Sequence, residues 1–165
     1  VNDKIPVEIG KAVEACGVDF VSVHGRTRAG KYKAPVDYDA IKAMKEAISI
    51  PVIANGDIKD YDKAKEVLAY TNADGVMIGR GAIGKPWVFY QLKHGIEDIS
   101  NELKKEIILE HFDAMLKFHG PHGAIMFRKL LHSYSKGYTG ANEFRDIVNK
   151  ISDIAVMRDM IENFF

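Results

Sequence analysis

The chain has 165 residues, of which 47% are hydrophobic and 28% charged, and its formal net charge is zero. These values fit one ordinary globular domain or two small ones, and they give no bulk attraction to a polyanion. The single cysteine, Cys16, excludes an intramolecular disulfide, and no apolar run approaches the ~18 residues of a membrane span.

The start of the chain shows no basic segment followed by an apolar stretch, so no secretion signal is predicted. A lone cysteine suits a reducing compartment, and we therefore expect a cytoplasmic protein. The sequence begins with Val1 rather than methionine and starts inside a helical pattern, from which we expect a processed or truncated product.

Helices and strands are predicted to alternate in the first part of the chain. Helices are expected at residues 4–16, 37–47 and 60–70, strands at 20–23, 51–54 and 73–78, and then a short helix and another at 86–94. Asp37 and Asp60 are the expected N-caps of the second and third helices. Cys16 continues the apolar helical spacing of Ile9 and Val13, so we expect it to be a small core residue.

Consecutive predicted strands lie about 25–30 residues apart with one helix between them, which is the spacing of βαβ units. The strand at 51–54 is uniformly apolar, as is typical of a strand buried on both faces of a parallel sheet. Three such strands cannot close a barrel. We therefore predict an α/β part made of the last three βα units of a TIM (β/α)8 barrel. A doubly wound sheet is the alternative, weakened because no Gly-x-Gly-x-x-Gly follows the first strand.

Each predicted strand ends in a polar or glycine-rich motif: His24-Gly-Arg, Asn55-Gly-Asp and Gly79-Arg-Gly. The carboxyl ends of parallel strands meet at one rim, where α/β proteins bind ligands. We expect His24 to contact an anion, and Gly79 with Arg80 to cradle a phosphate through backbone N–H groups, a helix dipole and one guanidinium. Residues 55–57 read equally well as a plain strand-to-helix turn.

The second part of the chain is predicted to be all-α, so we place two domains at residues 1–97 and 98–165. Helices are expected at residues 100–118, 124–136, 141–150 and 152–163, an up-down pattern with short loops. Ser152 is the expected N-cap of the last helix.

Two stretches of the chain are basic although the net charge is zero. Residues 21–36 and 114–142 contain no Asp or Glu. Their candidate anion-binding residues are Arg26, Arg28, Lys31, Lys33, Arg128, Lys129, His132 and Lys136. A nucleic-acid backbone would suit these cations, and an ordinary solvated surface remains the alternative.

No metal site or hydrolytic triad is predicted. His119 and His122 lie three residues apart, but a Gly-Pro turn separates them and no cysteine or carboxylate is near. No Ser-His-Asp arrangement has supporting context.

Three motifs together resemble the tRNA-dihydrouridine synthases, close to their bacterial DusB-type branch. The motifs are Val23-His-Gly-Arg-Thr-Arg28, Ile50-Pro-Val-Ile-Ala-Asn-Gly-Asp-Ile58 and Val76-Met-Ile-Gly-Arg-Gly-Ala-Ile-Gly-Lys-Pro-Trp87. The resemblance runs in order along essentially the whole chain. It implies a TIM barrel followed by an RNA-binding helical domain, and a flavoenzyme in which NADPH reduces FMN and hydride passes to the C5–C6 bond of a uridine in tRNA.

The resemblance also implies roles for individual residues. His24 would contact FMN, and its ribityl and phosphate groups would be held by Asn55, Gly56, Asp57, Gly79 and Arg80. The loop 26–33 and the patch 117–136 would meet the tRNA backbone. The family's catalytic cysteine lies on a loop upstream of this chain and Cys16 does not match it, so we predict no catalytic residue here and no activity from the isolated chain.

Two other functions stay open at this point. The chain could be an RNA-binding module without activity, or part of another FMN-dependent barrel such as a dihydroorotate dehydrogenase-like enzyme. The unpaired edges of the predicted sheet would favour self-association of the isolated chain.

Overall fold

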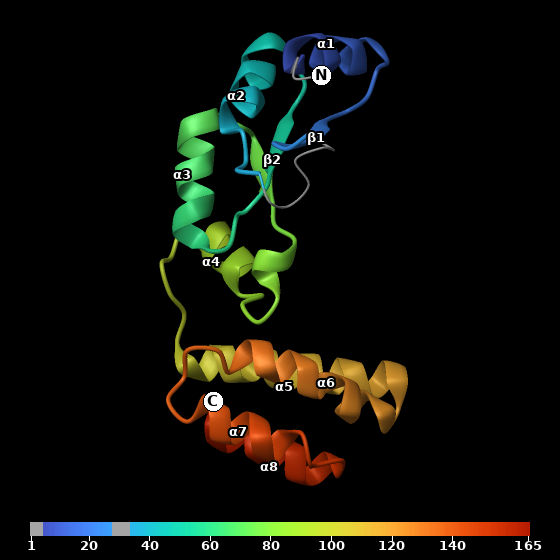
Figure 1. Ribbon diagram of the computed structural model, residues 1–165, viewed down its shortest axis with the longest axis vertical. Helices are drawn as coiled ribbons and strands as arrows, with labels where there is room; N and C mark the ends of the chain where they lie inside the picture. The colour runs from blue at the N-terminus through green and yellow to red at the C-terminus, as the bar shows by residue number, and fades with distance from the viewer. Residues whose placement is uncertain (1–4, 28–33) are drawn as a thin grey trace. The chain divides into compact units, whose positions relative to one another are not determined.

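The computed structural model of the chain describes residues 5–27 and 34–165. The chain divides into two compact units, Val1–Gly81 and Ala82–Phe165, whose helices and strands are labelled in Figure 1. Each unit has its own buried hydrophobic residues. Residues 82–97, which we place with the first domain from the sequence, belong to the second unit, where Trp87 stacks on Tyr134 with ring centroids 6.1 Å apart.

The first unit alternates helices and strands as predicted. Its elements are α1 (Pro6–Ala15), β1 (Val21–His24), α2 (Tyr38–Ala47), β2 (Val52–Asn55), α3 (Tyr61–Thr71), β3 (Gly75–Met77) and the start of the short 3-10 helix η1 (Arg80–Ala82). The strands form a parallel sheet in the order β1-β2-β3, which confirms the predicted parallel strands. Among the described residues, β1 and β3 each pair with β2 alone, so both outer edges of the sheet are open.

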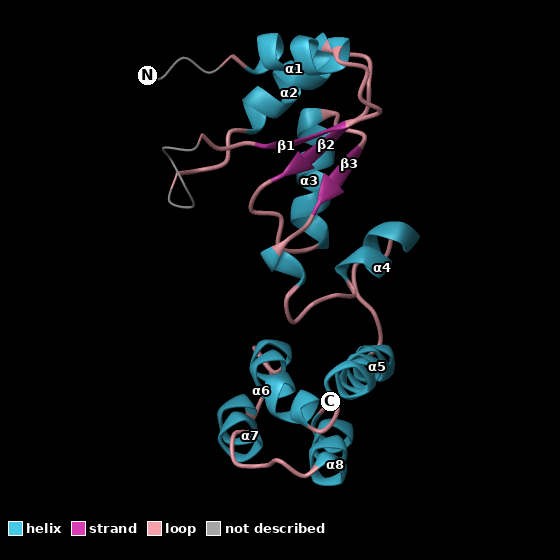
Figure 2. Cartoon of the chain, turned by 90° about the vertical axis from the view of Figure 1, so that its right-hand side faces the viewer, coloured by secondary structure: helices cyan, strands magenta, loops and turns pink. Residues whose placement is uncertain are grey.

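Helices α2 and α3 cover one face of this sheet, and Figure 2 looks onto the other face. Val52 and Ala54 of β2 are fully buried on the covered face, as is Ile41 of α2. Ile53 and Asn55 alternate with them and are only half-buried. The expectation that β2 is buried on both faces is therefore met on the helix side only.

Local side-chain caps explain where α2 and α3 begin. The Asp37 carboxylate accepts the Ala40 amide at 3.0 Å, and the Asp60 carboxylate accepts the Lys63 amide at 2.9 Å. Both N-caps are confirmed, and each satisfies an amide that the first helical turn leaves without a partner. Helix α3 ends at Asn72, whose positive φ of 56° is the left-handed conformation that asparagine tolerates.

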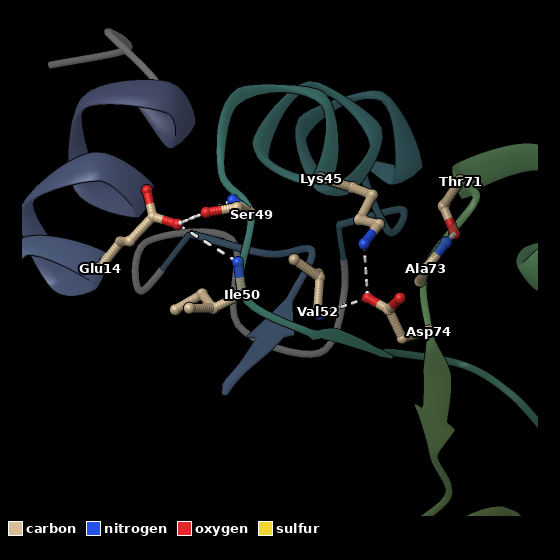
Figure 3. Close-up of polar contacts among 8 residues, drawn as sticks. All are labelled: Glu14, Lys45, Ser49, Ile50, Val52, Thr71, Ala73 and Asp74. Atoms are coloured by element: carbon tan, nitrogen blue, oxygen red, sulfur yellow. Dashed lines mark hydrogen bonds and ion pairs between the residues drawn. The ribbon is translucent and has the colours of Figure 1, made fainter. Parts of the chain in front are cut away.

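Carboxylates anchor the amino ends of the strands to the surrounding helices (Figure 3). Glu14 of α1 accepts the Ser49 amide at 2.7 Å and the Ser49 hydroxyl at 2.6 Å. Asp74, just before β3, accepts both the Lys45 ammonium and the Val52 amide at 2.7 Å. These hydrogen bonds hold the pKa values of both carboxyls below their usual range.

The prediction that Cys16 is a core residue is wrong: its side chain is exposed at the end of α1. Helix α1 packs on α2 through a different face, centred on Gly10, where an added Cβ would lie 2.8 Å from the Met44 side chain. Ile9 is consequently 51% exposed. Close helix packing at a glycine outweighed the apolar spacing from which the core position was predicted.

The second unit is helical. It contains α4 (Val88–His94), α5 (Asn101–His119), α6 (His122–Tyr134), α7 (Ala141–Val148) and α8 (Ile154–Phe164). Helix α5 packs on α6 and α8, and α7 packs on the same two helices. Their shared core includes Phe112, Phe127, Leu131, Val148 and Ile161, all fully buried. No helix of residues 5–27 and 34–165 is both long enough and apolar enough to cross a membrane.

The N-cap of the last helix differs from the prediction by one residue. Asp153, rather than Ser152, accepts the Val156 amide at 2.9 Å. Both side chains can cap a helix, and the helix begins one residue later than its apolar pattern indicated.

Candidate cofactor site

The carboxyl ends of the three strands lie level with one another. His24 is the register partner of Asn55, and Asn55 is the register partner of Met77. Because the three residues share one row of the sheet, their side chains lie on one face, the face that α2 and α3 leave uncovered. The carboxyl ends of the three strands, where the predicted motifs begin or closely follow, therefore lie at one edge of the sheet.

A chain of hydrogen bonds crosses this row. His24 Nδ1 lies 2.6 Å from Asn55 Oδ1, and Asn55 Nδ2 donates to the Met77 carbonyl oxygen at 2.7 Å. The Asn55 amide therefore joins β1 to β3 across β2. The imidazole of His24 is held at the end of this chain and is exposed.

Two residues beyond the row, Arg26 and Asp57 form an ion pair. The guanidinium donates two hydrogen bonds to the carboxylate, at 3.1 and 2.5 Å, and a third from Nε to the Ala34 carbonyl at 2.6 Å. The Arg26 side chain is only 5% exposed, against 39% for Asp57. The hydrogen bonds from Arg26, with its charge and those of Lys59 and Arg80, hold the pKa of Asp57 below its usual value.

Gly56 lets the loop before α2 approach β2 closely. Its φ is +131°, and a Cβ there would lie 2.8 Å from the Val36 side chain, so only glycine fits. The Tyr38 hydroxyl donates to the Gly56 carbonyl at 2.7 Å, and burial raises the pKa of this tyrosine. Residues 34–38 are thus fastened against the 55–57 turn.

The turn after β3 has one open and one crowded glycine. A Cβ added at Gly79 would meet no atom within 4 Å, whereas one added at Gly81 would lie 2.3 Å from the Ile58 carbonyl oxygen. Gly81 therefore packs against the segment after β2, and Gly79 leaves its backbone open to approach. The expected helix after this turn is only the three-residue η1, so the predicted helix dipole contributes little here.

The arrangement offers an imidazole and the Arg80 guanidinium at one edge of a sheet, beside an accessible backbone turn. A guanidinium binds anionic groups, and an imidazole can donate or accept a hydrogen bond, so the edge suits an anionic and polar ligand. The described residues contain no cluster of three or more His, Cys, Asp or Glu that could hold a metal ion. A cavity of about 480 Å³ between α2 and α3 contains none of the predicted site residues.

In the helical unit, the predicted anion-binding residues divide into two pairs. Arg128 donates to the Ile151 carbonyl, and His132 Nε2 lies 3.0 Å from Asn149 Oδ1, so both tie α6 to the segment between α7 and α8. Lys129 and Lys136 are exposed to solvent. Arg28, Lys31 and Lys33 lie outside the described residues.

The sequence profile of the family described as "Dihydrouridine synthase (Dus)" matches residues 2–164. The chain belongs to this family. It is 50% identical over 163 residues to a probable tRNA-dihydrouridine synthase of Helicobacter pylori, which covers 98% of this chain and 50% of that protein. It is 43% identical over 171 residues to tRNA-dihydrouridine synthase B of Vibrio parahaemolyticus, covering 99% of this chain and 53% of that protein. The chain thus spans about half the length of the curated relatives it matches.

Sequence reasoning missed the structural role of Arg26. We predicted that Arg26 binds RNA, yet its guanidinium is buried and bonded within the protein. The positions of the two residues could have indicated this ion pair. Arg26 lies two residues after His24, Asp57 lies two residues after Asn55, and His24 and Asn55 are register partners. The opposite charges of Arg26 and Asp57 therefore lie at equivalent places after neighbouring strands. Tyr38 and Val36 gave no comparable signal, because their contacts with Gly56 depend on the path of the loop.

Proposed function

We propose that this chain is part of a flavin-dependent tRNA-dihydrouridine synthase that reduces the C5–C6 bond of uridine in tRNA, with NADPH as the reductant. One observation carries the proposal. In a member of the dihydrouridine synthase family, the ends of all three strands meet at one edge and present His24 and Arg80 there. FMN bound at this edge would supply the hydride.

The three strands are proposed to be the last three of a (β/α)8 barrel. The uncovered face of the sheet carries Ile53 and Met77, and Met77 is 48% exposed, as expected for side chains that a barrel interior would bury. Both outer edges of the sheet are open among the described residues. The relatives are about twice as long, and their remaining length would supply the other strands. In the isolated chain, the open edges would favour self-association.

The residues at the edge fit a flavin nucleotide. Gly79 has open space where a side chain would stand, so a phosphate could approach the backbone of the 79–81 turn. The positive charge of Arg80 would pair with that phosphate. Arg80 is close enough to Asp57 for its charge to contribute to the lowered pKa of that carboxyl. His24 would face the rest of the cofactor. Gly56 and Asp57 would shape the wall by fastening the loops, because their polar groups are already bonded to Tyr38 and Arg26.

The helical unit is proposed to contact tRNA through its exposed lysines. Lys117, Lys129 and Lys136 are exposed and belong to the stretch 114–142 that lacks carboxylates. A uridine in folded tRNA must be extruded to reach a cofactor, so backbone contacts and shape would carry most of the recognition. Three phosphate contacts predict that log Kd for tRNA rises with log salt concentration with a slope of about 2–3.

A flavin titration tests the cofactor site. Quenching of FMN fluorescence by the purified chain should give saturable binding, and Arg80→Ala should weaken it about 10- to 100-fold, the loss of a charge-assisted hydrogen bond. Lys59→Ala is the matched control, because Lys59 is also an exposed cation near Asp57. Equal losses in both variants would mean that only general positive charge matters, and tRNA binding without FMN binding would favour the RNA-binding module.

An activity assay tests where the chemistry lies. Cys16 precedes β1 and is thus at the amino end of the strand, away from the rim at the carboxyl ends. We therefore expect no dihydrouridine from the chain alone with FMN, NADPH and tRNA, and dihydrouridine from a full-length relative under the same conditions. Product formed by the chain alone would overturn this part of the proposal. Lys129→Glu should weaken tRNA binding more than the control Lys150→Glu, which lies outside the carboxylate-free stretch.

A further inference from the structure

We propose that Asn55 is a positioning residue that fixes the tautomer of His24. Neutral His24 is held with its proton on Nδ1, so that Nε2 is presented as a hydrogen-bond acceptor. This role differs from the direct cofactor contact that the family resemblance implies for Asn55. The proposal rests on the two hydrogen bonds of the Asn55 side chain, to Met77 and to His24, and on which of the atoms in them can act as donors.

The first bond orients the Asn55 amide. Its Nδ2 lies 2.7 Å from the Met77 carbonyl oxygen, and a carbonyl oxygen can only accept a hydrogen bond. The amino end of the Asn55 side chain must therefore point toward β3. Its Oδ1 must then point toward β1. This orientation is fixed by a backbone carbonyl, which does not change its protonation with pH.

The second bond places the proton on His24. Asn55 Oδ1 lies 2.6 Å from His24 Nδ1 and carries no hydrogen, so Nδ1 must be the donor. In neutral imidazole only one nitrogen bears a proton, and Nε2 is then unprotonated. Protonation of the ring can add a hydrogen only at Nε2, while the bond to Asn55 stays intact.

The position of His24 makes Nε2 the nitrogen that a ligand meets. His24 is exposed at the end of β1, on the uncovered face of the sheet. Among residues 5–27 and 34–165, the partner of its imidazole ring is Asn55. The other ring nitrogen, Nε2, is therefore the one that a ligand would contact.

A chemical preference follows for that group. Neutral His24 would accept a hydrogen bond from an O–H or N–H, whereas a carbonyl or phosphate oxygen could bind only after the ring gains a proton. If the proposed function holds, the partner on FMN is a donor: a ribityl hydroxyl or the imide N–H. This last step rests on the proposed function, and the tautomer itself does not.

Ring nitrogen NMR tests the tautomer without any cofactor. In the chain labelled with ¹⁵N-histidine, long-range ¹H–¹⁵N correlations at pH 8 should show His24 protonated at Nδ1 and bare at Nε2. His132 is the internal control with the opposite geometry, because its Nε2 faces Asn149 Oδ1 and should be the protonated nitrogen. His24 protonated at Nε2 in this spectrum would overturn the inference.

Two variants separate positioning from mere folding. Asn55→Leu removes the acceptor, so His24 should shift toward the Nε2–H form that solvated histidine prefers, while His132 stays unchanged. Asn55→Asp keeps an acceptor and should keep His24 protonated at Nδ1. An unchanged His24 tautomer in Asn55→Leu would contradict the assigned role. If Asn55→Leu does not fold, the wild-type and Asn55→Asp spectra decide the question.

Adding FMN to the wild-type chain tests the ligand step separately. An O–H or N–H donor should move the bare Nε2 resonance upfield, with the Nδ1 resonance nearly unchanged. Binding of FMN without any change at Nε2 would overturn the donor assignment. Absence of FMN binding would count against the proposed function and leave the tautomer result standing.

Discussion

Replacing Asp57 by Asn should destabilise the first unit, because it removes the negative charge that pairs with the buried Arg26 guanidinium. The Arg26 side chain is 5% exposed and donates two hydrogen bonds to Asp57. Asn preserves the size of the side chain and tolerates the positive φ of 48° at this position. The substitution therefore isolates the carboxylate charge from backbone strain.

The exposure of the two partners sets the expected cost. Removing one partner of a fully buried ion pair costs about 3–5 kcal/mol, while an exposed pair contributes about 0.2–1 kcal/mol. Here Arg26 is buried but Asp57 is 39% exposed, so solvent screens part of the interaction. We expect a loss of about 2 kcal/mol, equivalent to about a 30-fold change in the unfolding equilibrium.

Amide hydrogen exchange in β2 measures this loss directly. The protected amides of Val52–Asn55 should exchange about 30-fold faster in Asp57→Asn at pH 7, since exchange follows the opening equilibrium. Asp62→Asn, an exposed carboxylate of the same unit, is the control and should change rates by about 2-fold at most. Equal rates in Asp57→Asn and wild type would refute the assigned role.

The same variant predicts a pH dependence with a definite sign. The pKa of Asp57 is lowered in the fold, chiefly by the hydrogen bonds from Arg26. Its contribution to stability is therefore present above the unfolded pKa of about 4 and is lost as pH falls through the lower folded pKa. The difference between wild type and Asp57→Asn should shrink below about pH 4. A difference that persists at pH 2 would require another cause.

Three further predictions concern caps, titration and glycine packing. Asp153→Ala should destabilise the helical unit by about 1 kcal/mol and Ser152→Ala by less than about 0.5 kcal/mol, read from urea unfolding with the single tryptophan as reporter. Burial lowers the pKa of His111, so the helical unit should lose stability as pH falls below the unfolded value of about 6.5, and His111→Gln should flatten that slope in urea midpoints at pH 5 and 8. Gly81→Ala should destabilise the first unit by about 2 kcal/mol or more through its backbone clash, whereas Gly79→Ala should leave the thermal midpoint unchanged and weaken FMN binding.

Local signals in the sequence predicted the elements of the fold well. The N-caps at Asp37 and Asp60 and the three parallel strands were confirmed, because capping and hydrophobic period act within a few residues. The face of α1 was not predictable in this way. Whether Gly10 or Cys16 faces α2 depends on how closely two helices approach, which no pattern within one helix encodes.

The candidate site was predictable in position but not in the roles of its residues. His24 and Asn55 each end a predicted strand, and consecutive strands of βαβ units are parallel, so the sequence places both residues at one edge of the sheet, as the structure does. Charge alone, however, does not distinguish an arginine that binds a ligand from one that is buried against a carboxylate. Arg26 was predicted to bind RNA on charge, and the structure pairs it with Asp57.

This division of roles changes how substitutions at the site should be interpreted. Arg26 and Asp57 satisfy each other, so replacing either should reduce stability and affect a ligand only through the loops that they hold. His24 is exposed, and a residue that only contacts the ligand should change affinity while stability stays the same. Asn55 stands between the two classes, because its bonds set the protonation of His24. A substitution there should therefore alter the preferred ligand group at His24 and not simply the affinity.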